Sequence, residues 1–165
     1  MQDSNPRKQS YGQNRAGGQR RDNFNQKQKD DYPVQKWIDE NQFQEEWIKN
    51  GTDSEMIKYA EKAGEYMAKN DLTNSKIRSI YGEMKRIQMV GIEKGKASFL
   101  LLRPKVAYAL GREKGNKKGL QLFKFIFDEA SKAVEMASNE SKAFNNFCNL
   151  FEAILAYHKA HGGKD

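Results

Sequence analysis

Residues 140–161 read ESKAFNNFCNLFEAILAYHKAH and contain the strongest helical signal in the chain. Apolar side chains recur there at three- and four-residue spacings, the period of an α-helix, and they occupy much of the helix circumference. These side chains are Phe144, Phe147, Cys148, Leu150, Phe151, Ile154, Leu155 and Tyr157. A helix that is apolar on so many sides is either the central helix of a bundle or carries a second face for a partner. The stretch therefore predicts an all-helical domain.

Further helices are predicted upstream of this stretch. Their expected ranges are residues 54–69, a segment from Thr73 to a break at Gly91, residues 96–112 and residues 120–137. No window shows the alternation that is typical of a β-strand. Antiparallel helices joined by short loops form bundles, so the sequence predicts an all-α fold, a small helical bundle of about five helices.

Local signals mark the ends of these helices. Asp53 or the serine after it suits the N-cap of the first helix, and Thr73 suits that of the second. Gly91 and Gly95 are expected to form the break after the second helix. Pro104 lacks a backbone N–H, so we expect it to kink or restart the third helix.

The first 50 residues differ in composition from the rest. Residues 1–31 contain almost no aliphatic side chains and predict a disordered polar and basic tail. Residues 32–50 carry Trp37 and Trp47 among acidic and amide residues. We interpret this stretch as an aromatic-bearing docking segment, which packs on its own domain or on a neighbour. The helical bundle domain then covers residues 51–165.

The chain is basic, with 165 residues, a formal net charge of +7 and a sequence pI of about 9.4. Lysine and arginine displace counterions from phosphates, so this charge favours an anionic partner such as nucleic acid. Charge alone leaves open that the protein is simply basic and soluble.

Cysteine usage and apolar content bear on the cellular compartment. Cys148 is the one cysteine and lies in an apolar stretch, so we expect a buried small hydrophobe and a cytoplasmic protein. No window approaches the roughly 20 apolar residues of a membrane span, so no membrane partner is expected.

Catalytic and metal-binding patterns are missing from the sequence. His158 and His161 have no nearby Cys or Asp set to complete a metal site, apart from Asp165. Neither a Gly-x-Ser-x-Gly motif nor a phosphate loop is present. We expect carboxylates such as Glu83 and Asp128 to be solvated or paired, and Glu152 to be buried in an apolar stretch. The sequence therefore predicts no enzyme, no metal site and no cofactor.

Clusters of basic residues are the most informative functional signal. Arg78 and Lys85 lie on one flank of the second helix, Lys76 flanks the other side, and Arg86 points outward. The basic residues that follow along the chain are Arg103, Lys105, Arg112, Lys114, Lys117 and Lys118. If the helices are neighbours, these charges form one stripe suited to a phosphate backbone. Ordinary solvated helix faces are the alternative.

Two tyrosines lie among these basic residues. Tyr81 and Tyr108 could stack on nucleic-acid bases. Aromatic residues at helical spacing more often belong to the core.

Three segments resemble one known family. They are LTNSKIR (residues 72–78), LRPKVAYALGR (residues 102–112) and FEAILAYHK (residues 151–159). In this order they are similar to segments of the small helical subunit of the type III-A CRISPR–Cas (Csm) effector complex. The resemblance covers residues 70–160 and leaves residues 1–50 without a counterpart.

The resemblance implies a non-catalytic subunit that binds RNA. Its expected partners are guide and target RNA, other CRISPR effector subunits and further copies of itself, stacked head to tail. Carried over by position, the expected RNA contacts are Lys76, Arg78, Arg103, Lys105 and Arg112. Charge alone adds Lys85, Arg86, Lys117 and Lys118.

An alternative from the residues themselves is a helical adaptor whose basic face meets an acidic protein. Exposed Trp37 and Trp47 and the wide apolar face of residues 140–161 would favour it.

Overall fold

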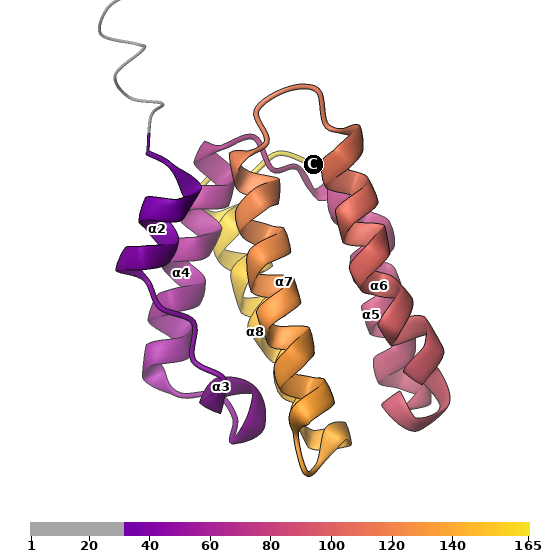
Figure 1. Ribbon diagram of the computed structural model, residues 1–165. Coiled ribbons are helices and arrows are strands. Elements are labelled where there is room, and N and C mark those ends of the chain that lie inside the picture. Colours follow the sequence, from indigo (N-terminus) through magenta and orange to yellow (C-terminus); the bar gives the residue numbers. More distant parts are fainter. Residues whose placement is uncertain (1–31) are drawn as a thin grey trace, which may run out of the picture. The chain divides into compact units, whose positions relative to one another are not determined.

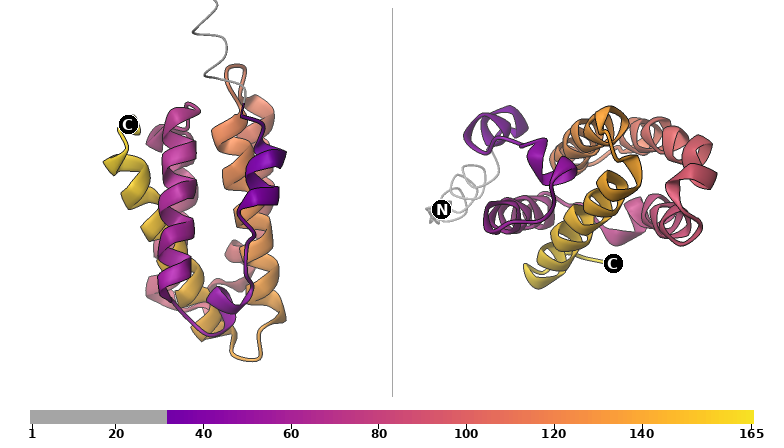
Figure 2. Two further views of the ribbon diagram at one scale, coloured as in Figure 1. Left: turned by 90° about the vertical axis from the view of Figure 1, so that its left-hand side faces the viewer. Right: turned by 90° about the horizontal axis from the view of Figure 1, so that it is seen from below.

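The computed structural model describes residues 32–165, which form one compact unit (Figures 1 and 2). This unit contains the helices α2 (Val34–Glu40), α3 (Glu46–Lys49), α4 (Ser54–Lys69), α5 (Asn74–Val90), α6 (Ile92–Arg112), α7 (Lys118–Met136) and α8 (Glu140–Ala160). No strand occurs in this part of the chain beyond one isolated bridge between Thr73 and Lys164. The all-α prediction is confirmed.

The predicted number of about five helices was too low, because seven lie within residues 32–165. The two additional helices, α2 and α3, have only seven and four residues. Segments this short complete one or two turns, so they show no apolar periodicity in the sequence. The predicted tail at residues 1–31 lies outside the described residues.

Helix α8 packs against five other helices, α3, α4, α5, α6 and α7. The ring of Phe147 lies 5.2 Å from that of Phe127 and 4.9 Å from that of Phe151, measured between centroids. All three side chains are fully buried. Burial of one such side chain stabilises the fold by about 1.5–3 kcal/mol. Contacts with five helices account for the many apolar side chains of α8.

Helices α2 and α3 pack against the rest of the unit through aromatic rings. Trp37 and Trp47 are only 4% and 2% exposed, and their rings lie 5.4 and 4.9 Å from the ring of Tyr59. The side-chain amide of Asn146 also donates a hydrogen bond to the carbonyl of Ile48, at 2.9 Å. Both tryptophans are therefore buried within the unit, and the exposed tryptophans that would have favoured the adaptor alternative are not found. The division between residues 32–50 and 51–165 stays a prediction.

Helices α5 and α6 form a hairpin that turns at a single residue (Figure 1). Gly91 adopts a φ of +87°, which favours glycine because it has no Cβ. Gly95 does not belong to the break, because it lies inside α6 against Ile87, where a Cβ would come within 2.8 Å of that side chain.

Helix α6 also continues through Pro104 without restarting. A proline in a helix leaves the carbonyl four residues earlier without its N–H partner. That residue, Leu100, is exposed, so water can satisfy the carbonyl.

Candidate nucleic-acid interface

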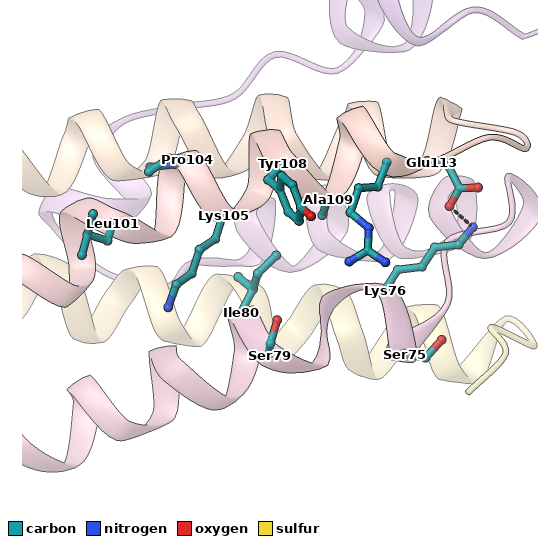
Figure 3. Close-up of a pocket in the computed structure, with 11 residues that line it drawn as sticks. Ser75, Lys76, Ser79, Ile80, Leu101, Pro104, Lys105, Tyr108, Ala109 and Glu113 are labelled. Atoms are coloured by element: carbon teal, nitrogen blue, oxygen red, sulfur yellow. Dashed lines mark ion pairs between the residues drawn. The ribbon is translucent and has the colours of Figure 1, made fainter.

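Helices α5 and α6 enclose a groove of about 830 Å³, which we call the α5–α6 groove (Figure 3). Its lining includes Ser75, Lys76, Leu101, Lys105, Tyr108, Arg112 and Glu113. Figure 3 shows Lys105 and Tyr108 extending from α6 toward α5. Three of the nine predicted RNA contacts, Lys76, Lys105 and Arg112, therefore come together here.

The cations of the α5–α6 groove differ in their partners. Lys76 forms an ion pair with Glu113 at 2.8 Å. This contact and the backbone N–H of Gly115 hold the pKa of the Glu113 carboxyl below its ordinary value, so Glu113 is anionic and neutralises Lys76. Lys105 and Arg112 are exposed and make no ion pair within residues 32–165. These two residues supply the positive charge of the groove that no ion pair opposes, although Lys105 is close enough to Glu83 to help lower the pKa of that carboxyl.

An exposed aromatic ring lies beside these charges. The side chain of Tyr108 is 66% exposed, and the guanidinium carbon of Arg112 lies 5.5 Å from the centroid of its ring. The sequence favoured a core position for this tyrosine, because its helical spacing matches that of the buried side chains. Only its exposure in the folded chain marks it as a candidate contact.

Two predicted RNA contacts on α5 face α8 instead. Arg78 lines a second groove of about 490 Å³ between α5 and α8, and it makes no ion pair within residues 32–165. Lys85 forms an ion pair with Glu152 of α8. The Glu152 side chain is 40% exposed, so the expectation that it is buried was wrong. Glu152 lies on the side of α8 that borders α5, beside Lys85.

Arg86 and Arg103 are held by carboxylates. Arg86 bonds Glu83 at 2.7 Å and reaches the Ser98 hydroxyl on α6 at 2.8 Å. Arg103 points toward α7, where it lies 3.7 Å from Asp128 and 3.4 Å from Glu135. Much of their charge is therefore neutralised within the fold.

The last two predicted contacts, Lys117 and Lys118, lie where the loop after α6 meets α7. Close packing anchors this end of the loop, since a Cβ on Gly119 would lie 2.8 Å from the Asn70 carbonyl oxygen. The nine predicted residues therefore lie on several surfaces and do not form one stripe. The sequence did not reveal this, because only Arg86 has its acidic partner nearby on its own helix, whereas the partners of Lys76, Lys85 and Arg103 come from other parts of the chain.

The histidine and cysteine side chains have structural surroundings. His158 is fully buried, with its Nε2 atom 2.7 Å from the carbonyl oxygen of Leu72, whereas His161 is exposed. Cys148 is buried as predicted, and burial raises the pKa of its thiol to about 12. Among the described residues, no group of three or more His, Cys, Asp or Glu side chains is placed to hold a metal ion.

None of the helices between residues 32 and 165 is long and apolar enough to cross a membrane.

Comparison with known proteins identifies the family. The family model described as Csm2 Type III-A matches residues 51–164, which include helices α4 to α8 and the whole lining of the α5–α6 groove. No curated protein and no solved structure matches the chain. The match covers more than two thirds of the sequence and confirms the resemblance seen in three of its segments. This chain belongs to the Csm2 Type III-A family and is a structural subunit of the type III-A CRISPR effector complex.

Proposed function

We propose that this subunit binds RNA through the α5–α6 groove and does not cleave it. The observation that carries the proposal is the pair Lys105 and Arg112, exposed on α6 without an ion pair in the described part of the chain. Each free cation can displace counterions from a phosphate, which favours binding without reference to sequence. Base pairing between guide and target RNA then supplies the sequence recognition.

The other predicted RNA contacts can be ranked by whether a carboxylate opposes their positive charge. Arg78 lies on the α8 side of α5 and has no ion pair within residues 32–165, so it is the next candidate. Lys117 and Lys118, at the loop before α7, remain among the predicted contacts and are not ranked by charge. The charges of Lys76, Lys85, Arg86 and Arg103 are opposed by nearby carboxylates. A phosphate must displace or tolerate those carboxylates, so we rank these four last.

Stacking of several copies belongs to the same proposal. Met89 and Met136 are 86% and 70% exposed, near the C-terminal ends of α5 and α7. The C-terminal ends of α5 and α7 lie at the end of the bundle opposite the loop between α6 and α7 (Figure 1). Exposed, flexible methionines are typical of surfaces that bind other proteins. We expect Met89→Asp/Met136→Asp to leave the fold intact but weaken assembly with other copies or subunits, as measured by sedimentation. Unchanged assembly would exclude this end as a stacking surface.

The adaptor alternative loses its two supporting features. Trp37 and Trp47 are buried against Tyr59, and the apolar surface of α8 is covered by neighbouring helices. RNA binding is therefore the better supported of the two functions.

The test is a fluorescence anisotropy titration with single-stranded RNA over a salt series. Lys105→Glu/Arg112→Glu should weaken binding about 10-fold or more for every sequence. It should also reduce the salt slope by roughly 0.7 for each lost phosphate contact. The matched control is Lys58→Glu/Lys62→Glu, which changes the net charge equally on the exposed face of α4. If both double variants lose RNA affinity equally, the net charge of the protein and not the groove determines binding. If Lys105→Glu/Arg112→Glu binds RNA as wild type does, the groove is excluded as the RNA-binding site.

The absence of catalysis is tested with labelled RNA and a divalent metal ion. We expect the RNA to remain intact. Cleavage that one carboxylate substitution abolishes, such as Glu83→Ala or Asp128→Ala, would contradict the proposal.

A further inference from the structure

The two tyrosines that the sequence could not distinguish lie in different environments. Tyr81 is half-buried at the groove between α5 and α8 and packs against the hydrophobic core. Tyr108 lies on α6 at the α5–α6 groove, and its side chain is 66% exposed. Only Tyr108 therefore offers much of its ring to a ligand.

Tyr108 has apolar neighbours on the same face of α6 and basic neighbours beside that face. Leu101, Pro104 and Tyr108 lie three and four residues apart, so they share one face of α6 and line the groove together. Leu101 is 58% exposed. A single exposed apolar side chain needs no explanation, but this row is bordered by Lys105 and Arg112, which make no ion pair with any other residue of the described range 32–165.

This combination matches the chemistry of single-stranded RNA. Its bases have flat aromatic faces that stack on tyrosine rings, and its phosphates are attracted to lysine and arginine. The volume of the groove, about 830 Å³, lies in the range of sites that hold small ligands. An acidic peptide would satisfy the cations, but it would leave the exposed ring without a planar partner.

We infer that Tyr108 is the stacking platform for one unpaired nucleotide, with Lys105 and Arg112 contacting the phosphates on either side of it. This inference rests on the proposed RNA binding and adds to it a contact with a base. Since bases inside a duplex are already stacked on one another, the nucleotide must come from a single-stranded or splayed segment. Every base has an aromatic face, so the site does not select a sequence.

The experiment separates base stacking from phosphate contact. The full chain is titrated with an oligouridine of about 12 nucleotides and with the same backbone carrying abasic sites. Wild type should bind the oligouridine about 5- to 100-fold more tightly, the range expected for one base–aromatic stack. Tyr108→Leu should lose this difference but keep the salt slope, because the phosphate contacts remain. Tyr108→Phe should keep most of the difference, because its ring still stacks.

The outcomes distinguish the two proposals. If wild type binds both oligonucleotides equally with a steep salt slope, the RNA-binding proposal stands and the stacking inference fails. If Tyr108→Leu keeps the preference for the oligouridine, or loses its salt slope together with its affinity, the inference also fails. If wild type binds neither oligonucleotide, both proposals fail. Because Tyr108 is exposed, thermal unfolding of the variants should match wild type, and this measurement serves as the folding control.

Discussion

The ammonium group of Lys76 lies 2.8 Å from the carboxylate of Glu113, so an ion pair joins the first turn of α5 to the residue that ends α6. The pair closes one end of the α5–α6 groove (Figure 3). It also holds an anion beside Arg112, at the place where we propose that phosphates bind. Glu113 therefore limits the positive charge of the groove.

Glu113→Gln should strengthen RNA binding. The substitution frees the charge of Lys76, so we expect a several-fold gain in affinity and a salt slope steeper by roughly 0.7. Anisotropy with single-stranded RNA measures both quantities. Glu55→Gln is the matched control, since Glu55 pairs with Lys58 at 2.8 Å on α4. Weaker binding by Glu113→Gln would show that Glu113 positions the groove and does not repel RNA.

The same ion pair should make stability depend on pH. The hydrogen bond that Lys76 donates to Glu113 is the largest contribution to the lowered pKa of this carboxyl, which lies below the ordinary value of 4.5. A carboxyl with a lowered pKa in the folded state stabilises the protein above its unfolded pKa. That contribution disappears as the pH falls through the folded value. The difference in the free energy of unfolding between wild type and Glu113→Gln should therefore be constant near neutral pH and shrink below pH 4.5. Urea unfolding down to about pH 3 measures it. A difference that does not change with pH would exclude the ion pair as its source.

Two glycine substitutions should have opposite effects on stability. A Cβ at Gly64 would lie 2.6 Å from the backbone nitrogen of His158 and 2.7 Å from the carbonyl oxygen of Ile154. Gly64→Ala should therefore force α4 away from α8 and cost about 2 kcal/mol or more. Gly82 lies inside α5, where an added Cβ would meet no neighbouring element of the described chain within 4 Å. Gly82→Ala should stabilise the protein by about 0.5–1 kcal/mol. Urea unfolding measures both, and a neutral Gly64→Ala would contradict the close packing of α4 on α8.

Trp47 should matter through the packing of its ring and not through its N–H group. The ring is 2% exposed, and its Nε1 atom has no hydrogen-bond partner in the described part of the chain. Trp47→Ala should cost about 3–5 kcal/mol, because it leaves a cavity beside Tyr59. Trp47→Phe should cost clearly less, because it keeps a ring and loses no hydrogen bond. If both substitutions cost the same in urea unfolding, packing of the ring would not explain the role of Trp47.

Local signals in the sequence predicted the helices that have a full amphipathic period. The expected range 54–69 agrees with α4 (Ser54–Lys69), and the Asp53 side chain accepts a hydrogen bond from the Met56 N–H, as an N-cap does. Thr73 occupies the N-cap position of α5, but its side chain makes no capping bond, and Lys164 supplies the carbonyl for the Asn74 N–H instead. Capping positions are local, whereas their partners depend on which segments meet in the fold.

The sequence by itself determined the all-helical class, the apolar side chains of α8 and the positive charge of the chain. These properties follow from spacing and composition, which act over a few residues. Only the tertiary structure decided which cations are neutralised and which ring is exposed. Lys85 meets Glu152 because α5 packs on α8, and Lys76 meets Glu113 because α6 folds back along α5. Tyr108 is exposed because no helix in the described part of the chain covers that face of α6. Electrostatic and stacking contacts act through space, so their partners are set by packing and not by spacing along the chain.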